Sequence, residues 1–174
     1  MTREFQLARC TLRPWRVGDE ASLVRHANNR NVSRNLKDRF PFPYTAADAD
    51  AWIRHAGAHS PVTAFAIEVD GAAVGGVGIE LGTDVHRRSA EIGYWLGEPF
   101  WGRGIATEAL RAVTEYAFAT FDICRLEAGV FDWNPASARV LEKAGYTLEG
   151  RARCAVVKDG RLGDRLLYAL VRSS

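Results

Sequence analysis

The sequence predicts an α/β fold built on a mixed, largely antiparallel sheet. Two turn signals, Asp70-Gly71 and Asp159-Gly160, each separate two strand-like segments and predict antiparallel hairpins. Between these hairpins the chain reads as strand, helix and strand, an order that suggests a parallel pair. We expect about four helices beside the sheet. The length suits one core, and we expect a single domain over residues 1–174.

A first strand is predicted over residues 4–13, where the side chains alternate along the chain. Pro14 is expected to close this strand, because proline cannot donate a ladder hydrogen bond. Asp19 is then placed to cap, or to charge, the first turn of a helix that ends near Ala27.

The segment 30–44 is predicted to be irregular and mixes basic with aromatic residues. Such segments often line binding sites. If the protein is an enzyme, we expect this segment and the loop around 82–88 to form the groove that binds the substrate accepting the transferred group. A connecting loop with a solvated basic face is the simpler interpretation of its arginines. Thr45 and Asp48 resemble a capping box and predict a helix to about Ala56.

The first hairpin is predicted to consist of strands at 62–69 and 72–82. The second of these is rich in glycine, which indicates a bulge or the close approach of another group. In the next strand Ala90, Ile92, Tyr94 and Leu96 share one face, and Glu91, Gly93 and Trp95 share the other.

A glycine-rich turn follows this strand and begins a helix. Gly102 and Gly104 allow a sharp turn and a close approach of the backbone to a ligand. The first N–H groups of the helix lack partners and lie at the positive end of its dipole, which suits a phosphate. A turn without a ligand is an equal alternative. Thr107 stands where a dinucleotide motif needs its third glycine, and no Gly-Lys-Ser/Thr motif is present.

The last third of the chain is predicted to hold a strand at 124–131, a short helix and two further strands at 151–158 and 164–172. Asn134 is placed to cap the short helix, Pro135 occupies its first position and Gly145 ends it.

Two of these motifs resemble the GNAT N-acetyltransferase superfamily, and their wording resembles its Rim-type branch, which includes acetyltransferases of ribosomal-protein N-termini. Gly104 and Ala106 match the end of the acetyl-CoA loop Arg/Gln-x-x-Gly-x-Gly/Ala, although Trp101 stands where that loop usually has Gln or Arg. About 30 residues later, Asn-x-x-Ser-x-x-x-Leu-Glu-Lys-x-Gly-Tyr, which begins at Asn134, resembles the closing motif of the fold. Either motif alone is weak, but their order and spacing are specific.

The resemblance implies a GNAT-like sheet with one splayed parallel strand pair and acetyl-CoA as the acyl donor. Its pyrophosphate would lie on the turn, and its pantetheine arm would pair with the strand edge like an added strand. The cofactor-binding residues implied are Tyr94, Trp95, Leu96, Gly102, Arg103, Gly104, Ala106, Thr107, Asn134 and Ser137. Arg103 is equally explained as a solvated arginine.

The resemblance also suggests catalytic residues. Glu91 is the candidate base for the acceptor amine, with an ordinary ion pair to an arginine as the equal alternative. Many family members carry a tyrosine that protonates the leaving sulfur, but this chain has Leu141 there, so Ser137 is the candidate donor. Asn134 would cap the helix, bind the pantetheine, or do both.

The expected function is acetyl-CoA-dependent N-acetylation of a primary amine, with a protein N-terminal α-amine as the favoured acceptor. A small amine, such as an antibiotic, a polyamine or an amino acid, is the alternative acceptor. A non-catalytic acyl-CoA sensor is an alternative of another class. The sequence leaves acyl-chain preference and oligomeric state open, with a homodimer among the options.

Composition excludes other classes of protein. A net charge of +2 gives no argument for nucleic acid, and no apolar run or signal-peptide core points to a membrane. Three widely spaced cysteines, Cys10, Cys124 and Cys154, fit free thiols in a reducing cytoplasm. His55 and His59 are four apart, but a frayed helix end explains them better than a metal site, and no metal is expected.

Overall fold

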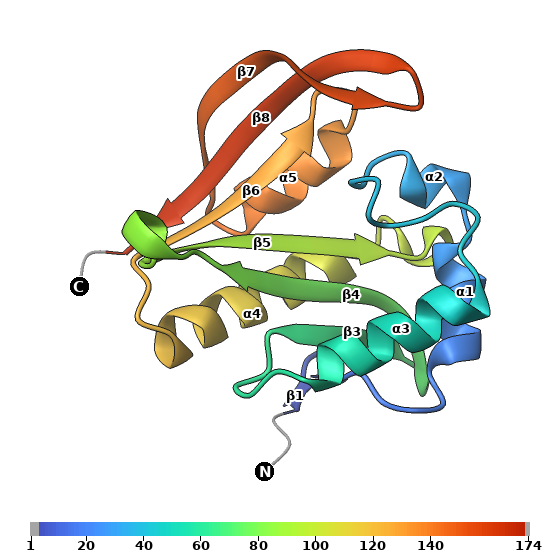
Figure 1. Ribbon diagram of the computed structural model, residues 1–174. Helices are drawn as coiled ribbons and strands as arrows, with labels where there is room; N and C mark the ends of the chain where they lie inside the picture. Colours follow the sequence, from blue (N-terminus) through green and yellow to red (C-terminus); the bar gives the residue numbers. More distant parts are fainter. Residues whose placement is uncertain (1–3, 173–174) are drawn as a thin grey trace.

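One eight-stranded sheet runs through the protein, in the order β1-β2-β3-β4-β5-β6-β8-β7 (Figure 1). The computed structural model describes residues 4–172, so Met1–Arg3 and residues 173–174 of the expected domain lie outside the described residues. Every neighbouring pair of strands is antiparallel except β5 (Ser89–Leu96) and β6 (Arg125–Phe131), which are parallel. The predicted mixed, largely antiparallel sheet is therefore confirmed.

The remaining elements follow the expected order along the chain. The other strands are β1 (Phe5–Gln6), β2 (Thr11–Pro14), β3 (Ala64–Val69), β4 (Ala72–Leu81), β7 (Thr147–Lys158) and β8 (Arg161–Val171). The helices are α1 (Glu20–Ala27), α2 (Arg30–Ser33), α3 (Ala46–Gly57), α4 (Ile105–Thr120) and α5 (Pro135–Lys143), with 3-10 turns η1 (Asp84–His86) and η2 (Glu98–Phe100). Asp70 and Asp159 begin the two hairpin turns with positive φ angles of 51° each.

The first strand differs from its prediction, because it is divided into β1 and β2. Between them the amide of Leu7 donates to the carbonyl of Cys10, and the amides of Ala8 and Arg9 donate to the carboxylate of Glu108 on α4. Pro14 is the last residue of β2 and does not lie beyond the strand. A distant carboxylate thus interrupts a ladder that the local alternation of side chains would continue.

The segment 30–44 also differs, because it begins with the single turn of α2. Asn29 caps this turn by accepting a hydrogen bond from the amide of Asn31. The predicted capping box of α3 is confirmed, since the Thr45 and Asp48 side chains each bond the other's backbone amide. The short α2 accounts for a fifth helix where about four were expected.

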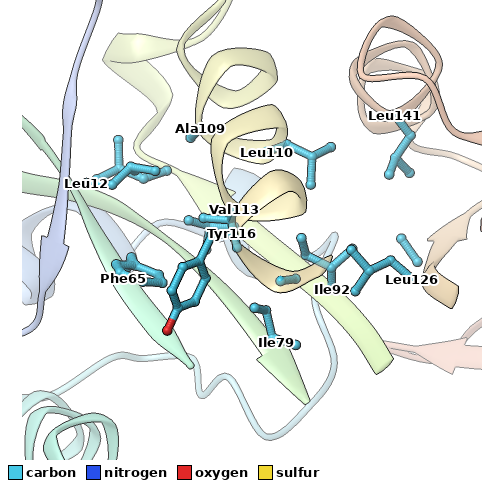
Figure 2. Close-up of a cluster of buried hydrophobic side chains, with 14 of the residues drawn as sticks. Leu12, Phe65, Ile79, Ile92, Ala109, Leu110, Val113, Tyr116, Leu126 and Leu141 are labelled. Atoms are coloured by element: carbon cyan, nitrogen blue, oxygen red, sulfur yellow. The ribbon is translucent and has the colours of Figure 1, made fainter. Parts of the chain in front are cut away.

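The helices cover both faces of the sheet (Figure 1). On one face, α4 packs against the strands in the larger core, which includes the buried side chains of Phe65, Ile92 and Leu126 (Figure 2). On the other face, α1 and α3 contribute Leu23 and Ile53 to a smaller core. The alternation predicted for β5 is confirmed, because Ile92 joins the α4 core and Trp95 packs beside the α3 core.

A buried ion pair joins the first strands to α1. The Arg13 side chain on β2 is 2% exposed, and its guanidinium donates two hydrogen bonds of 2.8 Å to the Asp19 carboxylate. Glu68 on β3 accepts a further bond from Arg13. Asp19 occupies the predicted N-cap position of α1, but its side chain makes no capping hydrogen bond to the helix and instead neutralises the buried Arg13 charge.

No helix among residues 4–172 is both long enough and apolar enough to cross a membrane. Cys10, Cys124 and Cys154 are free thiols. Burial, together with the nearby Glu108 carboxylate, raises the pKa of Cys10 to about 11. This thiol therefore stays protonated near neutral pH and acts as a small apolar side chain in the core.

Replacing Asp19 by alanine is expected to lower the free energy of unfolding by about 3 kcal/mol, because it leaves the buried Arg13 charge with Glu68 alone. Urea denaturation measures this change. Asp50→Ala is the matched control, since Asp50 pairs with Arg54 on the exposed face of α3 and should contribute less than about 1 kcal/mol. Equal losses in the two variants would contradict this account of Arg13.

Candidate active site

The site begins where the two parallel strands separate. β5 and β6 are paired at three positions only, Ser89 with Arg125, Ala90 with Leu126 and Glu91 with Glu127. Beyond these pairs β5 continues along β4, while β6 continues along β8 (Figure 1). The predicted splayed pair is thus confirmed, and the edge of β5 facing the gap makes no ladder with β6 after Glu91.

A cleft of about 1650 Å³ passes through this gap. The second half of β5, the glycine turn and the start of α5 line one part of it, and residues 35–41 with α3 line another. The candidate residues among its lining are Glu91, Tyr94, Trp95, Leu96, Gly102, Gly104, Ala106, Thr107, Asn134 and Ser137. Arg103 is not among the lining residues, and its guanidinium lies 5.4 Å from the centre of the Phe100 ring.

The glycine turn has the backbone conformation that its sequence predicts. Gly102 and Gly104 have φ angles of +73° and +77°, in the left-handed region that side chains disfavour. Gly104 is the N-cap of α4 and has no side chain to bond the first amides of the helix. The positive end of the longest helix therefore faces the cleft with its backbone donors uncovered by a cap.

Trp101 has a structural role in this turn. Its indole Nε1 donates a 2.7 Å hydrogen bond to the carbonyl oxygen of Leu96 at the end of β5. This bond holds the turn against the strand that lines the same cleft. A tryptophan can thus stand where glutamine or arginine is usual without loosening the turn.

Ser137 is held by both its helix and β5. Its amide donates to Asn134 Oδ1 at 3.3 Å, which is the capping bond of α5. The Tyr94 hydroxyl lies 2.7 Å from Ser137 Oγ and also donates to the Ser137 carbonyl oxygen at 3.1 Å. Asn134 therefore caps the helix, and a phenol from β5 orients the serine.

Burial raises the pKa of Tyr94 to about 12, against an opposing effect of the hydrogen bond from Ser137, so the phenol stays neutral. Sequence reasoning used only the backbone of Tyr94 and missed this side chain. A signal was available, because Tyr94 lies on the buried face of β5 and a buried phenol needs a hydrogen-bond partner. Leu141 lines the cleft and is fully buried in the α4 core, but its side chain is apolar and supplies no hydrogen-bond donor there.

Glu91 points to the opposite, α3-facing side of β5 and forms an ion pair with Lys37 Nζ. Glu80 on β4 stands directly beside it in register and accepts a 3.0 Å bond from Arg39. This bond, followed by the charge of Arg39, lowers the pKa of Glu80. Two adjacent carboxylates therefore lie in the cleft, and the segment 37–39 supplies a cation to each. The partner of Glu91 is a lysine, whereas the sequence suggested an ion pair with an arginine.

Beyond these carboxylates, the α3-facing surface of the sheet has no side chain at Gly93; we call this open area the bare sheet surface. Gly93 follows Glu91 on the same face, and a Cβ built there would meet no atom within 4 Å. The Trp95 indole comes next and lies over Gly76, where a Cβ would be 3.0 Å from Nε1. The Phe40 ring lies 5.4 Å from the Trp95 ring. An open apolar surface with an aromatic boundary thus extends from the carboxylates.

The residues that line the α3-facing part of the cleft differ in part from those expected from the sequence. Residues 35–41 line the cleft as predicted, but the loop around 82–88 does not. Residues 155–158 of β7 and the side chains of Trp52, His55 and His59 take its place. Hairpin β7–β8 folds back toward the segment 30–40, a long-range contact that local sequence does not encode. Within residues 4–172, no group of three or more His, Cys, Asp or Glu is placed to hold a metal ion.

Residues 9–147 match the acetyltransferase (GNAT) domain family. The chain belongs to this family. It is 45% identical over 84 residues to the probable N-acetyltransferase YjcK of Bacillus subtilis, a match covering 48% of this chain and 46% of that protein. The chain spans about half the length of the first curated relatives that it matches.

Two solved structures have a similar fold. Mycobacterium smegmatis RimJ in complex with CoA-disulfide is 30% identical, with a TM-score of 0.80 over 93% of this chain and 81% of that one. RimL, a ribosomal L7/L12 α-N-protein acetyltransferase solved with coenzyme A, is 22% identical, with a TM-score of 0.84 over 97% of this chain and 98% of that one. At 22% identity, the similarity to RimL supports only the fold of this protein.

Proposed function

We propose that this protein is an acetyl-CoA-dependent N-acetyltransferase that transfers an acetyl group to a primary amine. The observation that carries the proposal is the meeting of two features in one cleft. One is the uncapped, positive N-terminus of α4, and the other is the strand edge left free where β5 and β6 separate. Acetyl-CoA has an anion and an extended amide-bearing arm that match these two features.

In this proposal the pyrophosphate binds the amides of the glycine turn and the first turn of α4, at Gly102, Gly104, Ala106 and Thr107. The pantetheine arm lies along Tyr94, Trp95 and Leu96 as an added strand. Its thioester then lies near the apex of the gap, beside Glu91. The similarity to Mycobacterium smegmatis RimJ, which was solved in complex with CoA-disulfide, supports CoA as the ligand of this cleft. Arg103 is left as a solvated residue outside the cleft.

Attack on the thioester requires a neutral amine, because an ammonium has no free electron pair. We assign Glu91, directly or through water, to remove the proton. The acceptor amine must then displace Lys37 from Glu91. An α-amino group, with a reference pKa of about 8, loses its proton more easily than a lysine, at about 10.4. This difference favours a protein N-terminal α-amine over a side-chain amine.

Collapse of the tetrahedral intermediate releases a thiolate that needs a hydrogen bond. We assign this bond to Ser137 Oγ. When the Tyr94 hydrogen points to the Ser137 carbonyl, the serine hydrogen satisfies the phenol oxygen. Rotating the phenolic hydrogen onto Oγ frees the serine hydrogen for the sulfur. Tyr94 is thus a positioning residue that acts through Ser137.

The first test is thermal unfolding with and without saturating acetyl-CoA. At 100 times Kd the ligand should add about 2.7 kcal/mol, or roughly 5–10 °C for a domain of this size. Gly104→Asp should lose most of this shift, because it adds an anion at the N-terminus of α4. Gly160→Asp is the control for backbone strain, since Gly160 has the same φ of +77° in a hairpin turn. If the acetyl-CoA-dependent thermal shift persists in Gly104→Asp, the assignment of the pyrophosphate to the N-terminus of α4 is contradicted.

Removing the serine hydroxyl in Ser137→Ala should lower kcat about 100-fold, as expected for loss of a donor to developing negative charge. Tyr94→Phe should lower kcat about fivefold, since one hydrogen bond contributes about 1 kcal/mol. The double variant should be no slower than Ser137→Ala, because the phenol acts only through the serine. Steady-state kinetics test this, and additive losses would show that Tyr94 acts independently.

The bare sheet surface provides a test of the acceptor side. Gly93→Leu should fold normally, since its side chain enters open space, yet lower kcat/KM for an acceptor peptide about tenfold or more by filling the cleft. Its acetyl-CoA shift should persist. Gly150→Leu on β7 is the matched control, because its Cβ also meets nothing within 4 Å and Gly150 does not line the cleft. Unchanged kcat/KM in Gly93→Leu would place the acceptor elsewhere.

A further inference from the structure

We propose that Lys37 is itself an acetyl acceptor, so that the protein acetylates its own side chain in the cleft. This inference rests on the proposed function. The Lys37 Nζ atom is bonded to Glu91 Oε1, where the acceptor amine must lose its proton. Glu91 belongs to the last residue pair before β5 and β6 separate. Lys37 thus brings a primary amine to the apex of the gap assigned to the thioester.

The position of Lys37 in the cleft allows this reaction. Its side chain is about half exposed, at 52%, and belongs to the segment between α2 and α3, so it can leave Glu91 without disturbing a core. Lys37 and Glu91 line the same cleft as Tyr94 and Ser137. The amine, the candidate base and the candidate donor to the leaving sulfur therefore line one cleft, on the two sides of the gap in which we place the thioester.

The composition makes Lys37 distinctive. Among 23 lysine and arginine residues only three are lysines, Lys37, Lys143 and Lys158. Lys143 ends α5, and Lys158 is 8% exposed and bonded to Asp38 at 2.8 Å. The arginines cannot act as acceptors, because a guanidinium is not deprotonated in proteins. Of the three lysines, only Lys37 is bonded to the candidate base.

In the proposed reaction, the acetyl group moves from the sulfur of acetyl-CoA to Lys37 Nζ. Glu91 takes a proton from the Lys37 ammonium, and the neutral Nζ attacks the thioester carbon. The new N–C bond forms as the C–S bond breaks, giving N-acetyllysine, coenzyme A as its thiol and one proton released to water. The amide product is neutral, so it cannot keep the ion pair with Glu91. It remains in the cleft, and we expect the modified protein to turn over other acceptors more slowly.

The experiment is to incubate the purified protein with isotope-labelled acetyl-CoA and no acceptor, and to locate the label by peptide mass spectrometry. We expect one labelled acetyl group per chain, on Lys37, formed at a first-order rate independent of protein concentration. Lys37→Arg should lose the label, whereas Lys143→Arg should keep it. Glu91→Gln should slow labelling about 100-fold while retaining the thermal shift with acetyl-CoA.

Three results would overturn the inference without rejecting acetyl transfer to an added acceptor. The first is turnover of an added peptide with no label on Lys37. The second is labelling of the three lysines at similar rates, and the third is labelling unaffected by Glu91→Gln, since either indicates uncatalysed acetylation. Absence of both the thermal shift and peptide turnover would instead reject the proposed function, and this inference with it.

Discussion

The structure depends on a parallel pairing that lasts for only three residues. β5 is held on its other side by seven register pairs with β4, and β6 by seven with β8, so neither strand can turn back toward the other. The Tyr94 side chain extends from β5 to Ser137, which places the start of α5 at the gap. Backbone groups at the open edge need partners from solvent or from a ligand. A strand-like ligand arm provides such partners without any change of fold, and helix α4 begins at the same opening.

Much of the fold could be predicted because its signals are local. Asp-Gly turns mark both hairpins, alternation orients β5, and paired glycines start α4. The Thr45 box and the Asn134 cap likewise depend on residues a few positions apart. Two of the failures involve a side chain whose partner lies on another element, whereas the unpredicted helix α2 has a local cap at Asn29. Asp19 binds Arg13 instead of capping α1, and Glu108 divides the first strand.

In the candidate site, too, the features with local sequence signals could be predicted, and those that depend on tertiary packing could not. The glycine turn and the Asn134 cap of α5 depend on residues that are close together in the chain, and the sequence predicts both. The Tyr94 phenol and the Lys37–Glu91 pair bring together residues 43 and 54 positions apart, and their meeting depends on the packing of whole elements. Residues 155–158 replace the 82–88 loop in the cleft wall for that reason. Residue types therefore indicate the chemistry of this site, whereas the partners that orient each group follow from the tertiary structure.

The segment 30–40, which includes α2, makes four ion pairs with the rest of the protein in addition to its apolar contacts. Arg30 pairs with Asp159, Lys37 with Glu91, Asp38 with Lys158, and Arg39 with Glu80. These bonds connect one segment to β4, β5 and the β7–β8 hairpin, and the segment's own members of each pair are more than half exposed. Salt weakens such pairs, because the screening length falls from about 8 Å at physiological ionic strength to about 3 Å at 1 M. The sheet beneath is held by apolar burial and backbone bonds, which salt leaves largely intact. Residues 35–41, which line the cleft, are therefore the part of its wall that we expect to respond most to the ionic strength of the surroundings.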